Sequence, residues 1–571
     1  MSRGPSRLTL DSMAREPGEG GRLVFDLVDD DAAGSEQSVP AHGDGAPGPG
    51  DDDPGAPGRP SGGSVLSDRR MRFLVPVAAV LAVVLGTGLA VEGARDGARV
   101  ERMRDVRGGV ADVSRPLAET WRWDGVVGSP EAEDEWRTIE VAMLGDVLAL
   151  ESEGELVALR PATGEEAWTV ALGEDPDCGP LDSDGWGRSV TSALVCLEGP
   201  AGDRTTRVVG PEGQVSASRR LPAGDTERFG EPRPGPDGSV LRARRAGAGP
   251  ALDLSDARCT DTGECAGTVR DGQGLEVRAE DAVTGEERWR ATVPFRPTRA
   301  DQCNNWLGVT WDGSANMVDL AQMIDPEVFG ARIGADLVQL YGCGIESALT
   351  RDGVLLGTEF EPGSGGVGSL LSGGYAEYSY DDTLRTVLYS DDGTLVGEIP
   401  GSVTDAGVTD GEGPGVLLGM DSGGPHLRAY ELDGTPRWDV TARAGGQRFL
   451  AHVAGTMLVM TGAGDVRGLD AATGEARWVW DSAEGGTGDG YLEDLFVYQT
   501  FTDGESVLLL TESGSGGAAL VALDAVSGEV VWEQHGDDAV TGGITRGFDR
   551  SLIAVDGRLL EVTPDGVRGL G

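Results

Sequence analysis

Short apolar runs separated by turn-forming residues recur along the chain after residue 115. In one example, the apolar run Leu520–Leu523 suits a buried strand, Asp524–Glu529 can reverse the chain, and Val530–Trp532 begins a return strand. Asp and Ser side chains in such a turn hydrogen-bond to local backbone N–H groups, and Gly528 tolerates a positive φ. The pattern predicts a β-hairpin.

The same hairpin recurs with a tryptophan at nearly the same offset, and four of its copies keep an eleven-residue spacing. The tryptophan-bearing segments are Ala158–Trp168, Ala279–Trp289, Ala429–Trp438, Gly468–Trp478 and Ala522–Trp532. Weaker copies without the tryptophan cover 207–215, 387–396 and 559–567, which gives about eight in all. Hairpins that need neighbours to stay folded, repeated every few tens of residues, predict four-stranded blades arranged radially. A short helix is expected only near Met317–Leu340.

The pattern Ala-x-Asp-x-x-Thr-Gly-x-x-x-Trp resembles the docking motif of PQQ-like β-propellers. That family includes the quinoprotein alcohol dehydrogenases and non-enzymatic outer-membrane assembly lipoproteins. The resemblance covers 115–571 and implies an all-β propeller of seven or eight blades, with tryptophans docked between adjacent blades. It also implies that Ala118–Trp123 is the opening strand that closes the ring against the last blade. The tryptophans expected to be structural are Trp168, Trp289, Trp438, Trp478 and Trp532.

An uncharged run of nineteen residues, Phe73–Val91, precedes the repeats. About twenty such residues cross a bilayer as a helix, and the run is too long for the apolar part of a signal peptide. We therefore expect a transmembrane helix at 71–92 and a juxtamembrane linker at 93–114 before the propeller. Residues 1–70 are rich in Gly, Pro, Asp and Ser, which predicts a disordered acidic tail.

The orientation in the membrane rests on arginines and cysteines. Arg69, Arg70 and Arg72 lie just before the apolar run and favour a cytoplasmic N-terminus. Further arginines after the run weaken this argument. All six cysteines follow the run, however, as expected for an oxidising compartment. The sequence therefore predicts a single-pass protein of the cell membrane with a cytoplasmic N-terminus and an extracytoplasmic propeller.

The cysteines themselves predict structural disulfides. Cys259 and Cys265 flank a hairpin turn that brings its two ends together. Order along the chain alone favours two further pairs, Cys178–Cys196 and Cys303–Cys343. Six cysteines allow 15 pairings, so these two pairs stay open at the level of sequence. A zinc site would need C-x-x-C or histidine partners at ligand spacing, and neither is present.

Composition removes several classes of function. The formal charge of −49 argues against binding of nucleic acid or anionic lipid by the outer domain. The chain has no lysine, which excludes a G-x-x-x-x-G-K phosphate loop and a lysine Schiff base. Gly363–Gly368 matches G-x-G-x-x-G but lies in a Gly/Ser-rich stretch without strand-to-helix context. The clustered carboxylates at Asp175–Asp184 could bind calcium, but their spacing does not match that of the EF-hand loop. An acidic surface turn is the favoured interpretation. No catalytic, cofactor-binding or metal-binding residue is assigned.

Three functions remain. The first is a non-catalytic scaffold of the cell envelope that binds a protein or a wall component. The second is a dehydrogenase, for which the resemblance would imply PQQ, calcium, a catalytic aspartate and two adjacent cysteines, and no adjacent pair exists. The third is a sensor that signals through the helix to residues 1–70, which carry no kinase-like or DNA-binding motif. We adopt the scaffold as the working hypothesis, with no cofactor and an oligomeric state that the sequence leaves undetermined.

Overall fold

The computed structural model describes residues 95–571 except for 129–140, 182–189, 317–327, 358–367, 481–495, 536–550 and shorter gaps of up to five residues. The chain divides into two compact units, Met1–Val80 and Leu81–Gly571, and all the described residues belong to the second. The predicted tail at 1–70 and transmembrane helix at 71–92 lie outside the described residues. Of the helices that the structure does describe, none is long and apolar enough to cross a bilayer.

The domain is all-β. In the described part of the chain, nine sheets of three to five strands contain most of the strands, and we number them in chain order. Sheets 1 to 3 consist of β2 (Val141–Leu144), β3 (Val147–Ser152), β4 (Glu155–Leu159), β5 (Glu166–Ala171) and β7 (Val190–Thr191); β6 (Asp177–Gly179), β8 (Leu194–Glu198), β9 (Thr205–Val209) and β10 (Arg219–Arg220); and β11 (Pro232–Gly235), β12 (Ser239–Ala246), β16 (Gly274–Asp281) and β17 (Glu287–Val293).

The middle three sheets are built in the same way, from hairpins that follow one another along the chain. Sheets 4 to 6 consist of β21 (Phe329–Ile333), β22 (Leu337–Gly342) and β23 (Ile345–Thr350); β24 (Gly368–Leu371), β25 (Gly374–Tyr380), β26 (Leu384–Ser390) and β27 (Leu395–Pro400); and β28 (Ser402–Asp405), β30 (Leu417–Met420), β31 (His426–Tyr430) and β32 (Pro436–Thr441).

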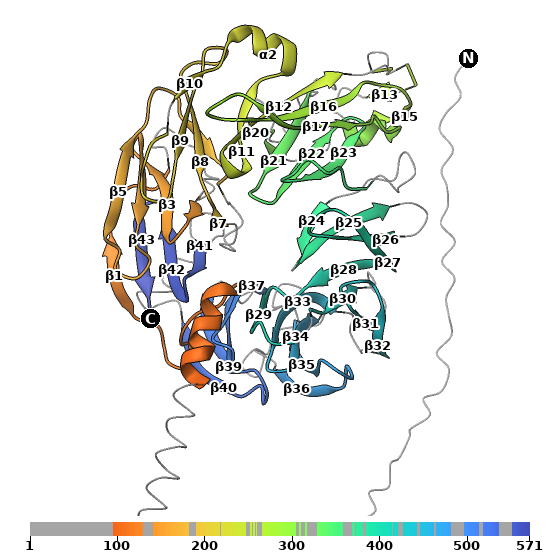
Figure 1. Cartoon of the computed structure of the whole chain (residues 1–571). Helices are drawn as coiled ribbons and strands as arrows, with labels where there is room; N and C mark the ends of the chain where they lie inside the picture. Colours follow the sequence, from red (N-terminus) through yellow and green to blue (C-terminus); the bar gives the residue numbers. More distant parts are fainter. Residues whose placement is uncertain are drawn as a thin grey trace, which may run out of the picture. The chain divides into compact units, whose positions relative to one another are not determined.

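The last three sheets include the one that joins the two ends of the domain. Sheets 7 to 9 consist of β29 (Val408–Thr409), β33 (Gly446–Val453), β34 (Thr456–Thr461), β35 (Val466–Asp470) and β36 (Ala476–Trp480); β37 (Phe496–Thr502), β38 (Ser506–Glu512), β39 (Ala518–Asp524) and β40 (Val530–His535); and β41 (Ser551–Val555), β42 (Arg558–Thr563), β43 (Gly566–Leu570) and β1 (Glu119–Trp123). Figure 1 shows the sheets succeeding one another, with β7, β24 and β37 nearer the centre and β5, β27 and β40 nearer the outside.

Smaller elements decorate the connections between these sheets. A helix at 95–105 precedes β1. The remaining short elements are α2 (Ala223–Phe229), the 3-10 turns η1 (Pro236–Gly238) and η2 (Ala300–Cys303), and the two-residue strands β13 (Arg258–Cys259), β14 (Cys265–Ala266), β15 (Thr268–Val269), β18 (Thr298–Arg299), β19 (Gly308–Val309) and β20 (Ala315–Asn316).

The repeated turn has the local structure that its residues predict. Asp524 Oδ1 accepts hydrogen bonds from the backbone N–H of Val526 at 3.1 Å and of Ser527 at 2.7 Å. Gly528 has a φ of 72°, a left-handed conformation that favours glycine. Burial by itself would raise the pKa of Asp524, but the hydrogen bonds from Ser527 and Val526 outweigh it and lower the pKa. The turn is therefore fixed by the sequence itself, before any packing between sheets.

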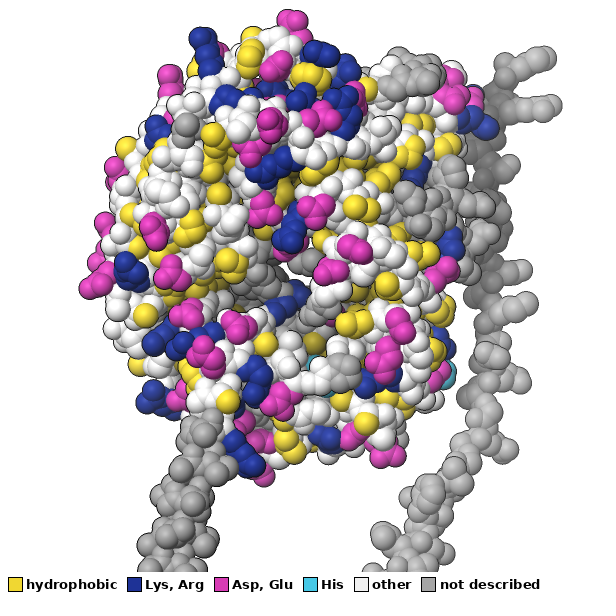
Figure 2. All heavy atoms as spheres, viewed as in Figure 1, with side chains coloured by type: hydrophobic (Ala, Val, Ile, Leu, Met, Phe, Trp, Pro, Cys, Tyr) yellow, Lys and Arg dark blue, Asp and Glu magenta, His cyan; other side chains and the backbone are white. Residues whose placement is uncertain are grey.

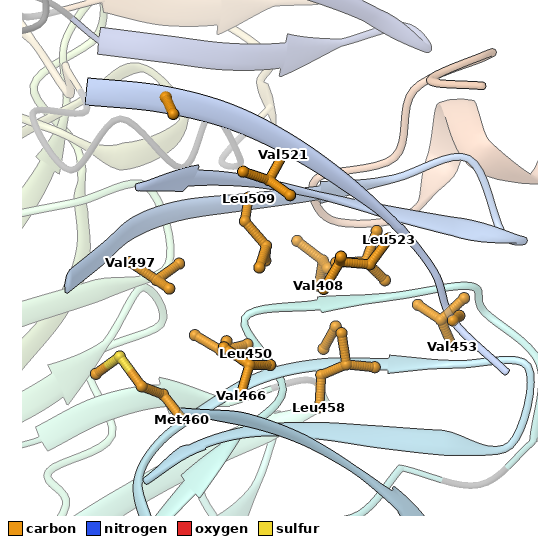
Figure 3. Close-up of a cluster of buried hydrophobic side chains, with 14 residues drawn as sticks. Val408, Leu450, Val453, Leu458, Met460, Val466, Val497, Leu509, Val521 and Leu523 are labelled. Carbon is orange, nitrogen blue, oxygen red and sulfur yellow. The ribbon is translucent and has the colours of Figure 1, made fainter. Parts of the chain in front are cut away.

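The hydrophobic core lies between neighbouring sheets. Each described sheet shares a cluster of buried apolar side chains with the next, and sheet 9 shares one with sheet 1. Figure 3 shows the cluster between sheets 7 and 8, where Leu450 and Leu458 face Leu509 and Val521. Because each apolar face is covered only by its neighbour, the sheets depend on one another for stability.

The ends of the domain meet in sheet 9. The strand β1 pairs antiparallel with β43, with Trp121 opposite Gly569 and Trp123 opposite Val567. Backbone hydrogen bonds between Ala118 and Gly571 extend the pairing by one residue at each end. The prediction that Ala118–Trp123 is the opening strand against the last repeat is confirmed.

The region 290–385 differs from the sequence-based expectation. The predicted helix near Met317–Leu340 is wrong over its described part, because β21 and most of β22 lie there. Val338 and Leu340 are buried while their neighbours Leu337 and Gln339 are only partly so, a two-residue period that belongs to a strand. These strands belong to sheet 4, which has no tryptophan and was not recognised as a repeat. Nine sheets are thus described, where seven or eight blades were expected.

Candidate functional site

The connections between strands fall on two opposite faces, because each sheet is an antiparallel meander. One face carries the turns from first to second strand, such as Asp503–Glu505 and 556–557, and the turns from third to fourth strand, such as 470–475. We call it the clasp face. The other face carries the connections between sheets and those from second to third strand, such as the described parts of 252–273 and 294–316. We call it the loop face.

On the clasp face, four of the repeated tryptophans join their sheet to the next one. The indole N–H of each donates a hydrogen bond to a backbone carbonyl in a turn of the next sheet, and that of the fifth, Trp532, donates to the segment before β1. The pairs are Trp168 to Pro211 at 2.8 Å, Trp289 to Arg351 at 2.9 Å, Trp438 to Ala471 at 3.1 Å, Trp478 to Ala525 at 3.3 Å, and Trp532 to Val113 at 2.7 Å. Trp532 is buried, with 8% of its surface exposed, and the other four are partly buried. These contacts support the structural role proposed for all five.

The glycine of the turn lies directly against the indole. A Cβ on Gly474 would come within 2.7 Å of the Trp438 ring, and one on Gly528 within 2.3 Å of the Trp478 ring. Both glycines also have a positive φ. The glycine of the Thr-Gly-Glu motif therefore has two roles. It adopts the positive φ of the turn, and its lack of a side chain lets the tryptophan ring of the preceding repeat pack against the backbone.

Of the two disulfides in the described part of the chain, one lies within the strands of sheet 2 and the other on the loop face. Cys178 bonds to Cys196 between neighbouring strands of sheet 2, and Cys303 bonds to Cys343 between two loop-face connections. The two pairs that order along the chain favoured are confirmed. Cys259 and Cys265 lie directly opposite each other where β13 pairs with β14, which suits the third predicted bond. The side chains of this last pair lie outside the described ones, and the bond stays a prediction.

Two aromatic side chains stand exposed at the loop-face end of β37. Phe496 is 47% exposed and Tyr498 is 36% exposed, and their rings meet edge to face at 4.7 Å. Arg448 of the neighbouring sheet donates hydrogen bonds to the backbone carbonyls of Val497 and, at 3.0 Å, Tyr498. Burial lowers the pKa of Arg448. An apolar pair fixed beside a cation is a suitable contact for a protein partner.

Charged groups elsewhere are mostly paired within the domain. Asp177, one of the carboxylates considered for calcium, lies 3.3 Å from Arg233 and 4.0 Å from Arg204. Burial raises the pKa of Asp177 against the effect of these two arginines. No group of three potential metal ligands occurs within the part of the chain that is described. Figure 2 shows acidic and basic side chains interspersed over the visible face.

The segment between the predicted membrane helix and β1 is folded onto the clasp face. Its helix at 95–105 presents Arg99, Arg102 and Met103 to the domain, at the spacing of one helix face. Met103 is fully buried, and in Figure 1 the helix lies beside β37 and β40. We call residues 95–118 the clasp segment. Where the sequence predicted a linker at 93–114, much of the chain is in contact with the domain.

The comparisons with known proteins agree with this architecture. The fold and its tryptophan-linked hairpins define a repeat protein of the β-propeller class. Residues 385–536 match the family described as "Outer membrane protein assembly factor BamB". This match covers sheets 6 to 8 and the last two strands of sheet 5, and the chain is a PQQ-like repeat propeller. The curated proteins contain no match to it.

Solved structures with a partial likeness to the chain include three propeller-sized proteins. BamB from Moraxella catarrhalis is 12% identical and covers 80% of this chain and 99% of its own, with a TM-score of 0.32. Sqt1 from Saccharomyces cerevisiae is 11% identical, with coverages of 80% and 99% and a TM-score of 0.33. The computationally designed protein Ika8 is 10% identical, with coverages of 76% and 97% and a TM-score of 0.31. Likenesses of this size do not bear on function.

Proposed function

We propose that the chain is a membrane-anchored scaffold of the cell envelope that binds a protein partner through its loop face. The observation that carries the proposal is that the two faces of the domain carry different features. On the clasp face, the clasp segment contacts sheets 6, 8 and 9, and it begins at residue 95, shortly after the transmembrane helix expected at 71–92. The loop face carries long connections, the disulfide Cys303–Cys343 and the exposed aromatic pair.

The family match supports a protein partner. The matching family is named for an assembly factor of outer-membrane proteins, a role carried out on other proteins. The expected anchor is the helix at 71–92, with the N-terminus in the cytoplasm and the propeller outside. We further propose that binding uses no cofactor. A wall polymer is the alternative ligand, and it would meet the same face.

The test places a photoreactive amino acid at either of two exposed positions in the full-length protein. Tyr498 lies on the loop face, and Val526, which is 53% exposed, lies in a clasp-face turn of the same sheet. After illumination of intact cells, we expect a small set of envelope proteins crosslinked at Tyr498 and absent at Val526. Mass spectrometry identifies them.

Equal capture at both positions, or no capture at Tyr498, would contradict a loop-face scaffold. In that case the purified protein is supplied with PQQ and calcium and assayed for dye-linked alcohol oxidation. Oxidation above the level of the protein alone would replace the scaffold by the dehydrogenase hypothesis.

A further inference from the structure

The clasp segment bridges the sheets that meet where the domain closes. The N–H of Val110 donates to Thr502 O at 2.8 Å, in sheet 8, and the N–H of Ala111 donates to Gly557 O at 2.8 Å, in sheet 9. The Thr502 N–H donates in turn to Gly108 O at 3.0 Å. Short parallel bridges therefore bind the segment to the first turns of both sheets.

Four arginines of the clasp segment extend this contact to sheet 6. Their carboxylate partners lie in first-to-second connections of sheets 6, 8 and 9 or, for Asp405, at the end of β28, the first strand of sheet 6. The pairs are Arg99 with Asp503 at 4.0 Å and Glu505 at 3.9 Å, Arg102 with Glu412 at 2.6 Å, Arg104 with Asp556 at 3.7 Å, and Arg107 with Asp405 at 3.4 Å. The clasp segment thus contacts sheets 6, 8 and 9 through charged side chains that surround the buried Met103.

A single residue of the segment links it to the tryptophan system. The carbonyl of Val113 accepts the indole N–H of Trp532, and its N–H donates to Asp503 Oδ2 at 3.1 Å. Val113 is fully buried, among Val110, Leu117 and apolar residues of sheets 8 and 9. At the other tryptophans, the accepting carbonyl belongs to the turn of the following sheet. Here that turn does not exist, because β43 and β1 are distant in sequence, and the clasp segment occupies its place.

We propose that the clasp segment is a releasable fastening of the domain. The closing seam consists of the pairing of β1 with β43 and the contact of Trp532 with Val113. Both parts of the seam are continuous in sequence with the helix at 95–105. A pull on the predicted membrane anchor, or a partner that captures this helix, withdraws Val113 and loosens the seam, while contacts between the other sheets persist. The anchor and the closure of the propeller are thereby coupled.

The test measures amide hydrogen exchange by mass spectrometry on the full-length protein in nanodiscs. Met103→Asp places a charge in the buried contact of the helix, and Arg99→Ala with Arg102→Ala removes its main ion pairs. The control is Arg115→Ala, an exposed arginine of the same segment that pairs locally with Asp112. We expect both clasp variants to raise exchange in β43 and β40 at least tenfold and to leave β16 and β22 unchanged. The control leaves all four strands unchanged.

Two results would overturn the proposal. Faster exchange in residues 95–118 alone, with β43 and β40 at the parent rate, would make the segment an attachment without influence on the seam. Faster exchange in every sheet would show general destabilisation. If Met103→Asp does not fold, the double arginine variant carries the test, because it introduces no charge and the buried Asp503 keeps its hydrogen bonds from the backbone N–H groups of Val113, Glu505 and Ser506.

Discussion

The contact between sheets 7 and 8 and the closing seam perform the same task with different parts. Between sheets 7 and 8, Trp478 rests on Gly528 and donates to Ala525, both in the turn of the next sheet. At the seam, Trp532 donates to Val113, which lies 419 residues away in the sequence. The ordinary contact is built into each repeat, whereas the seam depends on a segment outside the repeats.

Because of this difference, the ordinary interfaces and the closing seam contribute to cooperative folding in different ways. A repeat protein gains stability from the interfaces between neighbouring repeats, and each ordinary interface here is formed by residues of one repeat and the next. The seam instead brings together two segments that are distant in sequence, and closing this long loop costs more chain entropy than closing the short loop within a repeat. The buried contacts of Val113 and Met103 offset that loss. We therefore expect the seam to be the part of the domain most sensitive to substitution outside the repeats.

The largest effect is expected at the seam tryptophan. Replacing the buried Trp532 with alanine leaves a cavity and an unpaired Val113 carbonyl, and it should lower the free energy of unfolding by about 3–5 kcal/mol. Trp478→Ala, at a partly buried ring, should cost about 2–3 kcal/mol. Urea unfolding followed by circular dichroism measures both. If the two variants lose the same free energy of unfolding, the seam contact contributes no more to stability than an ordinary contact between sheets.

A smaller effect is expected at the glycine seat of an ordinary contact. Gly474→Ala brings a methyl group into the Trp438 ring at a positive φ, and it should cost about 3 kcal/mol. Gly455→Ala is the matched control, because Gly455 also has a positive φ but a methyl group there would meet no atom within 4 Å. It should cost about 1 kcal/mol, from the backbone alone. Thermal unfolding of the two variants separates the clash from the backbone strain.

The smallest effect is expected at a turn aspartate, and it depends on pH. Burial alone would raise the pKa of Asp281, but hydrogen bonds from Arg288, Thr284 and Val283 lower it to about 2. Because this folded-state pKa is below the ordinary value of about 3.9, the ionised group stabilises the fold fully above pH about 4 and loses that effect toward pH 2. After allowance for solvent screening, Asp281→Asn should cost about 1–2 kcal/mol at pH 7.

The measurement for this aspartate is urea unfolding at several pH values. The difference between the parent and Asp281→Asn should shrink as the pH falls from about 4 to 2. The control is Asp565→Asn, an exposed carboxylate in the last turn, for which no such difference is expected. A gap that stays constant down to the lowest pH would show that the aspartate acts through its shape and not through its charge.

Much of the fold was predictable because its signals are local. Asp524, Ser527, Gly528 and Trp532 stand at fixed offsets, so each hairpin and its tryptophan could be recognised from a short window of sequence. The disulfide between Cys303 and Cys343 was favoured only by order, since pairing depends on which loops share a face. Sheet 4 was missed although its turn, Arg351–Gly353, has the form of the weaker copies, because it lacks the tryptophan that marks the five clearest repeats.

The clasp segment and the loop-face aromatics were beyond the reach of local patterns. Arg99 and Met103 have the spacing of an amphipathic helix, a signal that was available in the sequence. Their partners Asp503 and Glu412 are more than three hundred residues away, and only the closed arrangement of sheets brings them together. Tyr498 looks like an ordinary strand residue until its exposure is known. A candidate binding surface is formed by residues that only the tertiary fold brings together, whereas a hairpin is formed by residues that are close in sequence.

The pairing of β1 with β43 also sets an order of events during biosynthesis. The strand β1 is made early, but its partner ends at Leu570, so its edge stays unpaired until nearly the whole domain has been translated. Sheets 1 to 8 can form in turn as the chain emerges, whereas sheet 9 must wait. For the whole of that interval, the exposed edge of β1 is open to pairing with other chains, which makes the newly made protein a client for chaperones.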